Sequence, residues 1–168
     1  LNTLGKLSIR DLEQYKGIGS AKAITILAAC ELGKRRQKAT VEEAPILNSA
    51  ENIYQFMHTT IQDLDIEEGW VLMMKQNFRL IEAKRISVGG LTMAPVDLRL
   101  MMKEVLLKNT TVLAFCHNHP SGSTNPSRED DMLTSHIHKA CDLLHIHFAD
   151  HVILTDGGYF SYREEGKL

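Results

Sequence analysis

The feature that most constrains this chain is a pair of histidines placed directly after a short apolar run. His117 and His119 follow residues 111–115, Thr-Val-Leu-Ala-Phe, and Pro120 comes next. The run begins with β-branched residues and is bounded by a proline that cannot donate to a sheet, so it predicts a buried strand. Side chains two residues apart on a strand point to the same face, so both imidazoles should project together from the strand's end.

A carboxylate follows at a distance that can bring it back to the histidines. Residues 120–126 form a polar loop, and Ser127 is a predicted helix N-cap that places Asp130 in the first helical turn. The same Ser-x-x-Asp pattern is also that of a plain capping box. Two imidazoles and one carboxylate, with a fourth position left open, are the ligand set of a catalytic zinc. The sequence therefore predicts a Zn²⁺ site made of His117, His119 and Asp130.

These residues resemble a known family. The string His-x-His-Pro, with seven residues between His119 and Ser127 and two more before Asp130, is similar to the JAMM (MPN+) metalloprotease motif. The longer string from His117 to Asp130 resembles the RadC (UPF0758-type) family, and this resemblance runs over nearly the whole chain. It implies an α/β (α+β) fold in which a mixed β-sheet is flanked by helices. The expected architecture is the three-layer sandwich of JAMM/MPN-like and cytidine-deaminase-like domains.

The resemblance also implies an activity. JAMM-like proteins hydrolyse amide or isopeptide bonds with a zinc-activated water, so the implied partner is a peptide or protein substrate. Glu67, at the start of an early strand, would be the general base, with Glu68 as the register-shifted alternative. Ser127 would donate a hydrogen bond to the oxyanion. The RadC name is further associated with DNA repair.

Two other functions stay open from the residues. The first is a DNA-processing, nuclease-like metalloprotein, and the second is a non-catalytic binding module that contains zinc. A second candidate set of metal ligands lies close together in the sequence: His145, His147, Asp150 and His151. It lacks a loop between its members, so we expect Asp150 to bond nearby backbone or His151 instead.

The N-terminal part predicts a second kind of site. Lys16, Gly17, Gly19 and Lys22 lie where one short helix ends and a longer helix, residues 21–34, begins. A Gly-x-Gly turn opening onto a helix leaves backbone N–H groups free for an anion. The pattern resembles a helix-hairpin-helix, which implies contact with DNA phosphates. The alternative is that the glycines only allow two helices to pack closely.

Composition and periodicity predict the domain organisation. We expect a helix-hairpin-helix module, truncated, over residues 1–36, a linker over 37–48 and an MPN/JAMM-like zinc domain over 49–168. The net charge of −2 divides into +5 for residues 1–40 and −7 for the rest, which favours different partners for the two parts. In the zinc domain the patterns predict helices at 49–64, 97–109 and 127–144, and extended segments at 70–74, 79–88, 111–115, 145–148, 152–155 and 159–161.

Location is suggested by what the chain lacks. Three scattered cysteines favour a reducing compartment, and no apolar run approaches the ~18 residues of a membrane helix. No signal-peptide pattern is present. We therefore expect a cytoplasmic protein with no membrane contact. Because the chain begins with Leu1, we also expect it to be a fragment of a longer protein.

Overall fold

The chain consists of two compact units. The computed structural model describes residues 4, 7–38, 44–89 and 96–168. The units are Leu1–Glu43 and Ala44–Leu168, so the boundary falls inside the segment predicted as a linker. Residues 39–43 of that predicted linker lie outside the described residues.

The first unit holds two helices, α1 (Ile9–Glu13) and α2 (Ser20–Lys38). Ser8 caps α1, and its hydroxyl and backbone N–H both donate to Asp11. Between the helices Gly17 adopts a φ of +91°, a conformation that favours glycine. The prediction that α2 ends near residue 34 is wrong, because the helix continues to Lys38. Arg, Gln and Lys are good helix formers, and Arg35 pairs with Glu31 one turn earlier.

The second unit is built on one five-stranded sheet. Its strands lie in the order β2-β1-β3-β4-β5, with β3 parallel to β4 and the other pairs antiparallel. The elements are α3 (Ala50–Ile61), β1 (Glu68–Met74), β2 (Leu80–Val88), α4 (Leu98–Leu107), β3 (Val112–Asn118), α5 (Arg128–Leu143), β4 (His147–Thr155) and β5 (Gly158–Ser161). The predicted mixed sheet is thus confirmed. None of the helices in the described part of the chain is long and apolar enough to cross a membrane.

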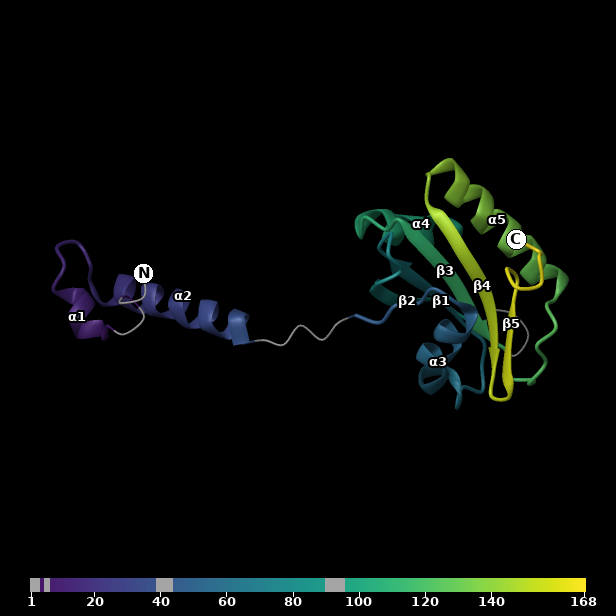
Figure 1. Ribbon diagram of the computed structural model, residues 1–168, viewed down its shortest axis with the longest axis horizontal. Coiled ribbons are helices and arrows are strands. Elements are labelled where there is room, and N and C mark those ends of the chain that lie inside the picture. The colour runs from purple at the N-terminus through teal and green to yellow at the C-terminus, as the bar shows by residue number, and fades with distance from the viewer. Residues whose placement is uncertain (1–3, 5–6, 39–43, 90–95) are drawn as a thin grey trace. The chain divides into compact units, whose positions relative to one another are not determined.

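Helices cover both faces of this sheet. Figure 1 shows α3 on one face and α4 with α5 on the other. The sheet contributes a buried core to each side: Leu72, Ala114 and Val152 face α3, whereas Val71, Leu113 and Phe115 face α4 and α5. This alternation follows from the two-residue period of the strands. The three-layer arrangement expected from the resemblance is therefore confirmed.

Strand β4 contains an irregularity that the sequence did not reveal. The segments predicted separately at 145–148 and 152–155 belong largely to one continuous strand. In its pairing with β3, Leu113 lies opposite Phe148 but Ala114 lies opposite Asp150, so Ala149 is an extra residue. Such a bulge reverses the inward and outward alternation of the residues that follow it. As a result His151 pairs with Phe115, on the α5 side of the sheet.

A gap in the side chains of β1 lies beside the end of β3. Gly69 is paired with Ser87 on one side and with His117 on the other. A Cβ placed on Gly69 would overlap Ser87 Oγ and lie 3.0 Å from Phe115 Cζ. The Ser87 hydroxyl is buried and has no hydrogen-bond partner among the described residues. The absence of a side chain at Gly69 thus leaves room for the Ser87 hydroxyl and the Phe115 ring.

We predict that Gly69→Ala destabilises the second unit by about 1–3 kcal/mol, because the added methyl overpacks the sheet. Ser87→Ala alone should have little effect, since it removes a hydroxyl without a partner. The double variant should recover part of the loss. Urea unfolding followed by the fluorescence of Trp70, the single tryptophan, measures all three. An identical loss for Gly69→Ala with and without the Ser87 hydroxyl would contradict the assigned overlap.

Candidate metal centre

Three ligand atoms converge at the end of β3. The Nε2 atoms of His117 and His119 lie 3.0 Å apart. Asp130 Oδ1 is 3.1 Å from His117 Nε2, and Oδ2 is 3.6 Å from His119 Nε2. In a tetrahedral zinc site with bonds of 2.0–2.1 Å, neighbouring ligand atoms are about 3.3–3.4 Å apart. Each side chain thus offers a ligand atom within 4.8 Å of the other two, a grouping that could hold a metal ion. That the ion is zinc stays a prediction.

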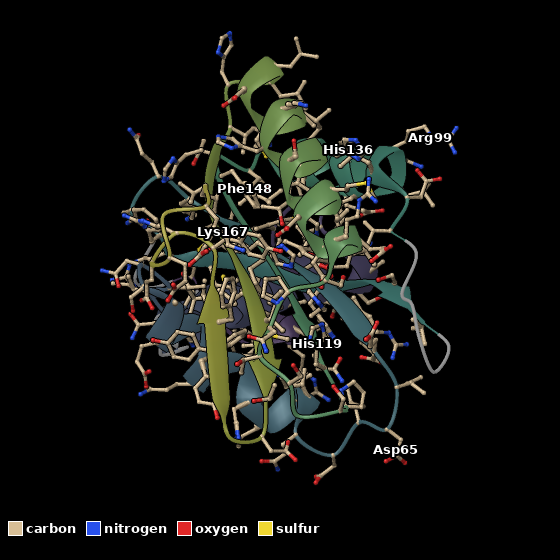
Figure 2. All side chains as sticks on the ribbon, turned by 90° about the vertical axis from the view of Figure 1, so that its right-hand side faces the viewer. Asp65, Arg99, His119, His136, Phe148 and Lys167 are labelled. Atoms are coloured by element: carbon tan, nitrogen blue, oxygen red, sulfur yellow. The ribbon has the colours of Figure 1, made fainter. Side chains whose placement is uncertain are left out.

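The fold brings these side chains together from two elements. His117 is buried within β3, and His119 follows the strand, where its backbone N–H donates to the carbonyl of Leu154 at 2.9 Å. Asp130 lies in the first turn of α5. In Figure 2, His119 lies near the N-terminal end of α5 and far along the sheet from Phe148. The site thus sits where a strand ends and a helix begins.

Asp130 is held as a carboxylate. Its Oδ2 accepts from the backbone N–H of Ser127 at 2.8 Å and from the Ser127 hydroxyl at 2.7 Å. Burial raises the pKa of Asp130, but its interactions with the adjacent His117 and His119 side chains outweigh this effect, so the pKa lies well below its ordinary value. The hydrogen bond with Asp130 in turn raises the pKa of His119 above its ordinary value, against the opposing effect of burial. An anionic oxygen is thus available to a cation.

Ser127 lies in the same place but its hydroxyl is occupied. The hydrogen of the Ser127 hydroxyl points to Asp130 Oδ2, and its oxygen accepts from the Asp130 backbone N–H at 3.1 Å. Ser127 and Asp130 therefore form a capping box, and the same capping box orients Asp130 as a candidate metal ligand. Ser127 lines the cavity in front of the histidines. Its role as an oxyanion donor stays a prediction.

The two candidate bases have different environments. Glu68 is buried, and its carboxylate accepts from Arg85 at 2.6 Å and from Trp70 Nε1 at 3.1 Å. Glu67, one residue earlier, lines the cavity that contains His117 and His119. The carboxylate of Glu68 therefore ties β1 to β2, whereas Glu67 is one of the residues that line the cavity in front of the histidines.

The cavity in front of the ligands has a volume of about 450 Å³. Phe115, Leu133 and Val96 supply apolar wall, and Glu67 with the ligand side chains supplies the polar part. Ligand sites commonly combine an apolar lining with a few convergent polar groups. The candidate metal position is thus accessible to a molecule larger than water.

The second candidate set of metal ligands does not assemble. Among the described residues, the side chains that come close enough together to share a metal ion are those of His117, His119 and Asp130. Asp150 instead accepts from the Ser161 hydroxyl and from the Arg163 backbone N–H. His151 is fully buried, and its Nε2 lies 2.8 Å from His117 Nδ1. Sequence reasoning missed this contact because only the bulge in β4 turns His151 toward His117.

The predicted DNA-binding residues lie in the first unit. Lys16 and Gly19 are exposed, and Gly17 forms the turn before α2. Lys22 Nζ donates to the Gly17 carbonyl at 2.8 Å, so this lysine closes the turn rather than standing free. Contact between these residues and DNA stays a prediction.

The raised pKa of His119 predicts opposite pH trends for the stability of the metal-free protein and for the stabilisation by zinc. Without metal, its pairing with Asp130 stabilises the fold below the ordinary histidine pKa, about 6.5, and this contribution is lost as the pH rises through the raised pKa. Zinc needs neutral imidazole, so stabilisation by zinc should grow over the same rise. We expect the melting temperature of the metal-free protein, relative to His119→Gln, to fall as the pH is raised above about 6.5, while the increase caused by zinc becomes larger. Parallel trends with and without zinc would contradict the assignment.

Comparison with known proteins places the chain in a family. Residues 47–167 match the model of the RadC-like JAB domain. A UPF0758 protein of Flavobacterium johnsoniae is 39% identical over 99% of this chain and 72% of its own length. UPF0758 proteins of Porphyromonas gingivalis and Rubrobacter xylanophilus are 34% and 37% identical, over 99% and 100% of this chain and 76% and 74% of their own lengths. The chain therefore belongs to the RadC family, and its second unit is a RadC-like JAB domain.

Proposed function

We propose that this protein is a zinc-dependent hydrolase of the metallopeptidase type, which cleaves an amide or isopeptide bond in a peptide or protein substrate. The observation that carries the proposal is the joint position of four side chains. His117, His119 and Asp130 offer ligand atoms that lie within 4.8 Å of one another, and Glu67 lines the same cavity. Three protein ligands that leave one position open are typical of catalytic rather than structural zinc sites.

Each part of the site has a place in amide hydrolysis. When bound, zinc would lower the pKa of a coordinated water to about 7 and polarise the scissile carbonyl. Glu67 would take a proton from the attacking water and give it to the leaving amine. Phe115 and Leu133 would exclude bulk water from one side of the substrate, which strengthens the electrostatic interactions within the cavity.

The backbone around Glu67 is held for this task. Asn118, between the two histidines, is buried and accepts at Oδ1 from the Glu68 backbone N–H at 2.7 Å. Its Nδ2 donates to the Ile66 carbonyl at 2.9 Å. The Glu67 carbonyl accepts from the Gly89 N–H at 2.8 Å. Asn118 thus fixes the backbone on both sides of Glu67, the candidate base.

The donor set favours amide over phosphodiester hydrolysis. Enzymes that cleave phosphodiesters commonly use two metal ions about 3.5–4 Å apart. Among the residues that the structure describes, one group of possible ligands assembles, with a single carboxylate. The basic first unit would then serve to bring the hydrolase to nucleic acid, consistent with the DNA-repair association of the RadC name.

We predict that Glu67→Gln lowers amide hydrolysis by about 10²–10⁴-fold, because the amide cannot act as a base. Zinc content should remain near one ion per chain, since the three ligands are unchanged. The assay incubates zinc-loaded protein with pools of peptides and of isopeptide-linked conjugates, followed by mass spectrometry. Parallel incubation with single- and double-stranded DNA tests the nuclease alternative.

A second carboxylate in the same cavity provides the matched control. Glu129 lines the cavity with an exposed side chain, and Glu129→Gln removes one negative charge just as Glu67→Gln does. If Glu129→Gln abolishes hydrolysis and Glu67→Gln does not, Glu67 is not the base. If wild-type protein loaded with zinc cleaves DNA and no amide, the proposed function is wrong.

A further inference from the structure

A chain of hydrogen bonds extends from the candidate ligand His117 into the core. His117 Nδ1 lies 2.8 Å from His151 Nε2, and His151 Nδ1 lies 2.6 Å from the Thr134 hydroxyl. Thr134 Oγ1 also lies 2.7 Å from the backbone carbonyl of Asp130. His151 is 0% exposed and Thr134 is 4% exposed, so the chain is shielded from water. It begins at one candidate ligand and ends on the backbone of another.

The direction of every hydrogen in this chain follows by elimination. A carbonyl oxygen can only accept, so the short contact between Thr134 and Asp130 requires the hydroxyl hydrogen of Thr134. Thr134 then offers only a lone pair to His151, whose Nδ1 must carry the hydrogen. A neutral imidazole has one N–H, so His151 Nε2 is an acceptor. His117 must therefore donate from Nδ1, and in the neutral form of His117 the Nε2 atom then carries a free lone pair.

That Nε2 atom is the one that faces the candidate metal position. It lies 3.0 Å from His119 Nε2 and 3.1 Å from Asp130 Oδ1. A histidine binds a metal only through a nitrogen that carries no hydrogen, and the hydrogen bond made by the other nitrogen decides which one this is. The orientation of hydrogens in the core thus determines whether His117 is ready to bind.

His119 reaches the same state through a different partner. Its Nδ1 lies 2.7 Å from the backbone carbonyl of Ser123, which can only accept, so the single hydrogen of neutral His119 is on Nδ1. Because a carbonyl oxygen can only accept, it fixes the tautomer of His119 without help from another group. The partner of His117 is an imidazole, which could donate or accept, so a second group is needed to set its direction. Thr134 meets that need.

We propose that Thr134 and His151 are positioning residues that set the tautomer of His117 and so prepare it for a metal ion. The inference rests on the metal site of the proposed function and adds two residues to it. Neither Thr134 nor His151 contacts the ion; both act through His117. The bulge at Ala149 is what turns His151 to this face of the sheet.

Isosteric variants of Thr134 test the proposal. In Thr134→Val the side-chain shape is kept but the acceptor for His151 is lost. His151 is then free to carry its hydrogen on Nε2 and donate to His117, whose own hydrogen would move to the metal-facing nitrogen. We expect Thr134→Val to weaken Zn²⁺ binding by about 10–100-fold, the range found when partners of metal-bound histidines are removed. Thr134→Ser keeps the hydroxyl and should bind Zn²⁺ close to wild type.

Zinc affinity is measured by competition with a chromophoric chelator, and ¹⁵N-labelled histidine NMR of the metal-free protein at about pH 8 reports the tautomers directly. Wild type and Thr134→Ser should show His117 with hydrogen on Nδ1, and Thr134→Val should show a population with hydrogen on Nε2. His151→Gln offers a carbonyl acceptor to His117 and should keep more affinity than His151→Leu, which offers none. Circular dichroism confirms that each variant is folded.

The outcomes separate this inference from the proposed function. Hydrogen on Nε2 of His117 in metal-free wild type, or equal zinc affinity for Thr134→Val and Thr134→Ser, would overturn the inference alone. Loss of affinity in Thr134→Val and not in Thr134→Ser would support it even if no amide substrate is cleaved, and the hydrolase proposal would then be the part that fails. A wild-type protein that binds no zinc would overturn both.

Discussion

The parallel pairing of β3 with β4 is the constraint on which the candidate site depends. Two parallel neighbours cannot be joined by a tight turn, so the chain returns through a crossover that contains α5. The crossover starts at the end of β3 and therefore places the first turn of α5, with Asp130, beside His117 and His119. Ligand sites in α/β sheets lie at the carboxyl ends of strands for the same reason. The same pairing sets His151 next to β3.

Local periods were enough to predict the three candidate ligands. The two-residue period of a strand places His117 and His119 on one face, and a Ser-x-x-Asp cap places Asp130 in the first turn of the following helix. Both patterns involve neighbours in sequence, and both appear in the structure as expected. The mixed sheet and its helical layers could also be predicted, because apolar periodicity and the RadC resemblance agree.

The parts that sequence could not supply depend on contacts between distant segments. The bulge at Ala149 changes which face His151 occupies, and no local pattern in β4 marks it. The difference between Glu67 and Glu68 rests on Arg85, which lies on the neighbouring strand and pairs with Glu68. The Thr134 hydroxyl reaches His151 only because α5 packs on β4. Each of these contacts is fixed by tertiary packing.

The proposed chemistry requires that His117, His119 and Asp130 together hold a zinc ion with one position open. X-ray absorption spectroscopy of the zinc-loaded protein tests it most directly. We expect a single shell of nitrogen and oxygen at about 2.0–2.1 Å, with the scattering pattern of two imidazoles and no sulfur. Sulfur at about 2.3 Å, which would mean that a cysteine is a ligand, or an outer-shell pattern lacking imidazole would contradict it.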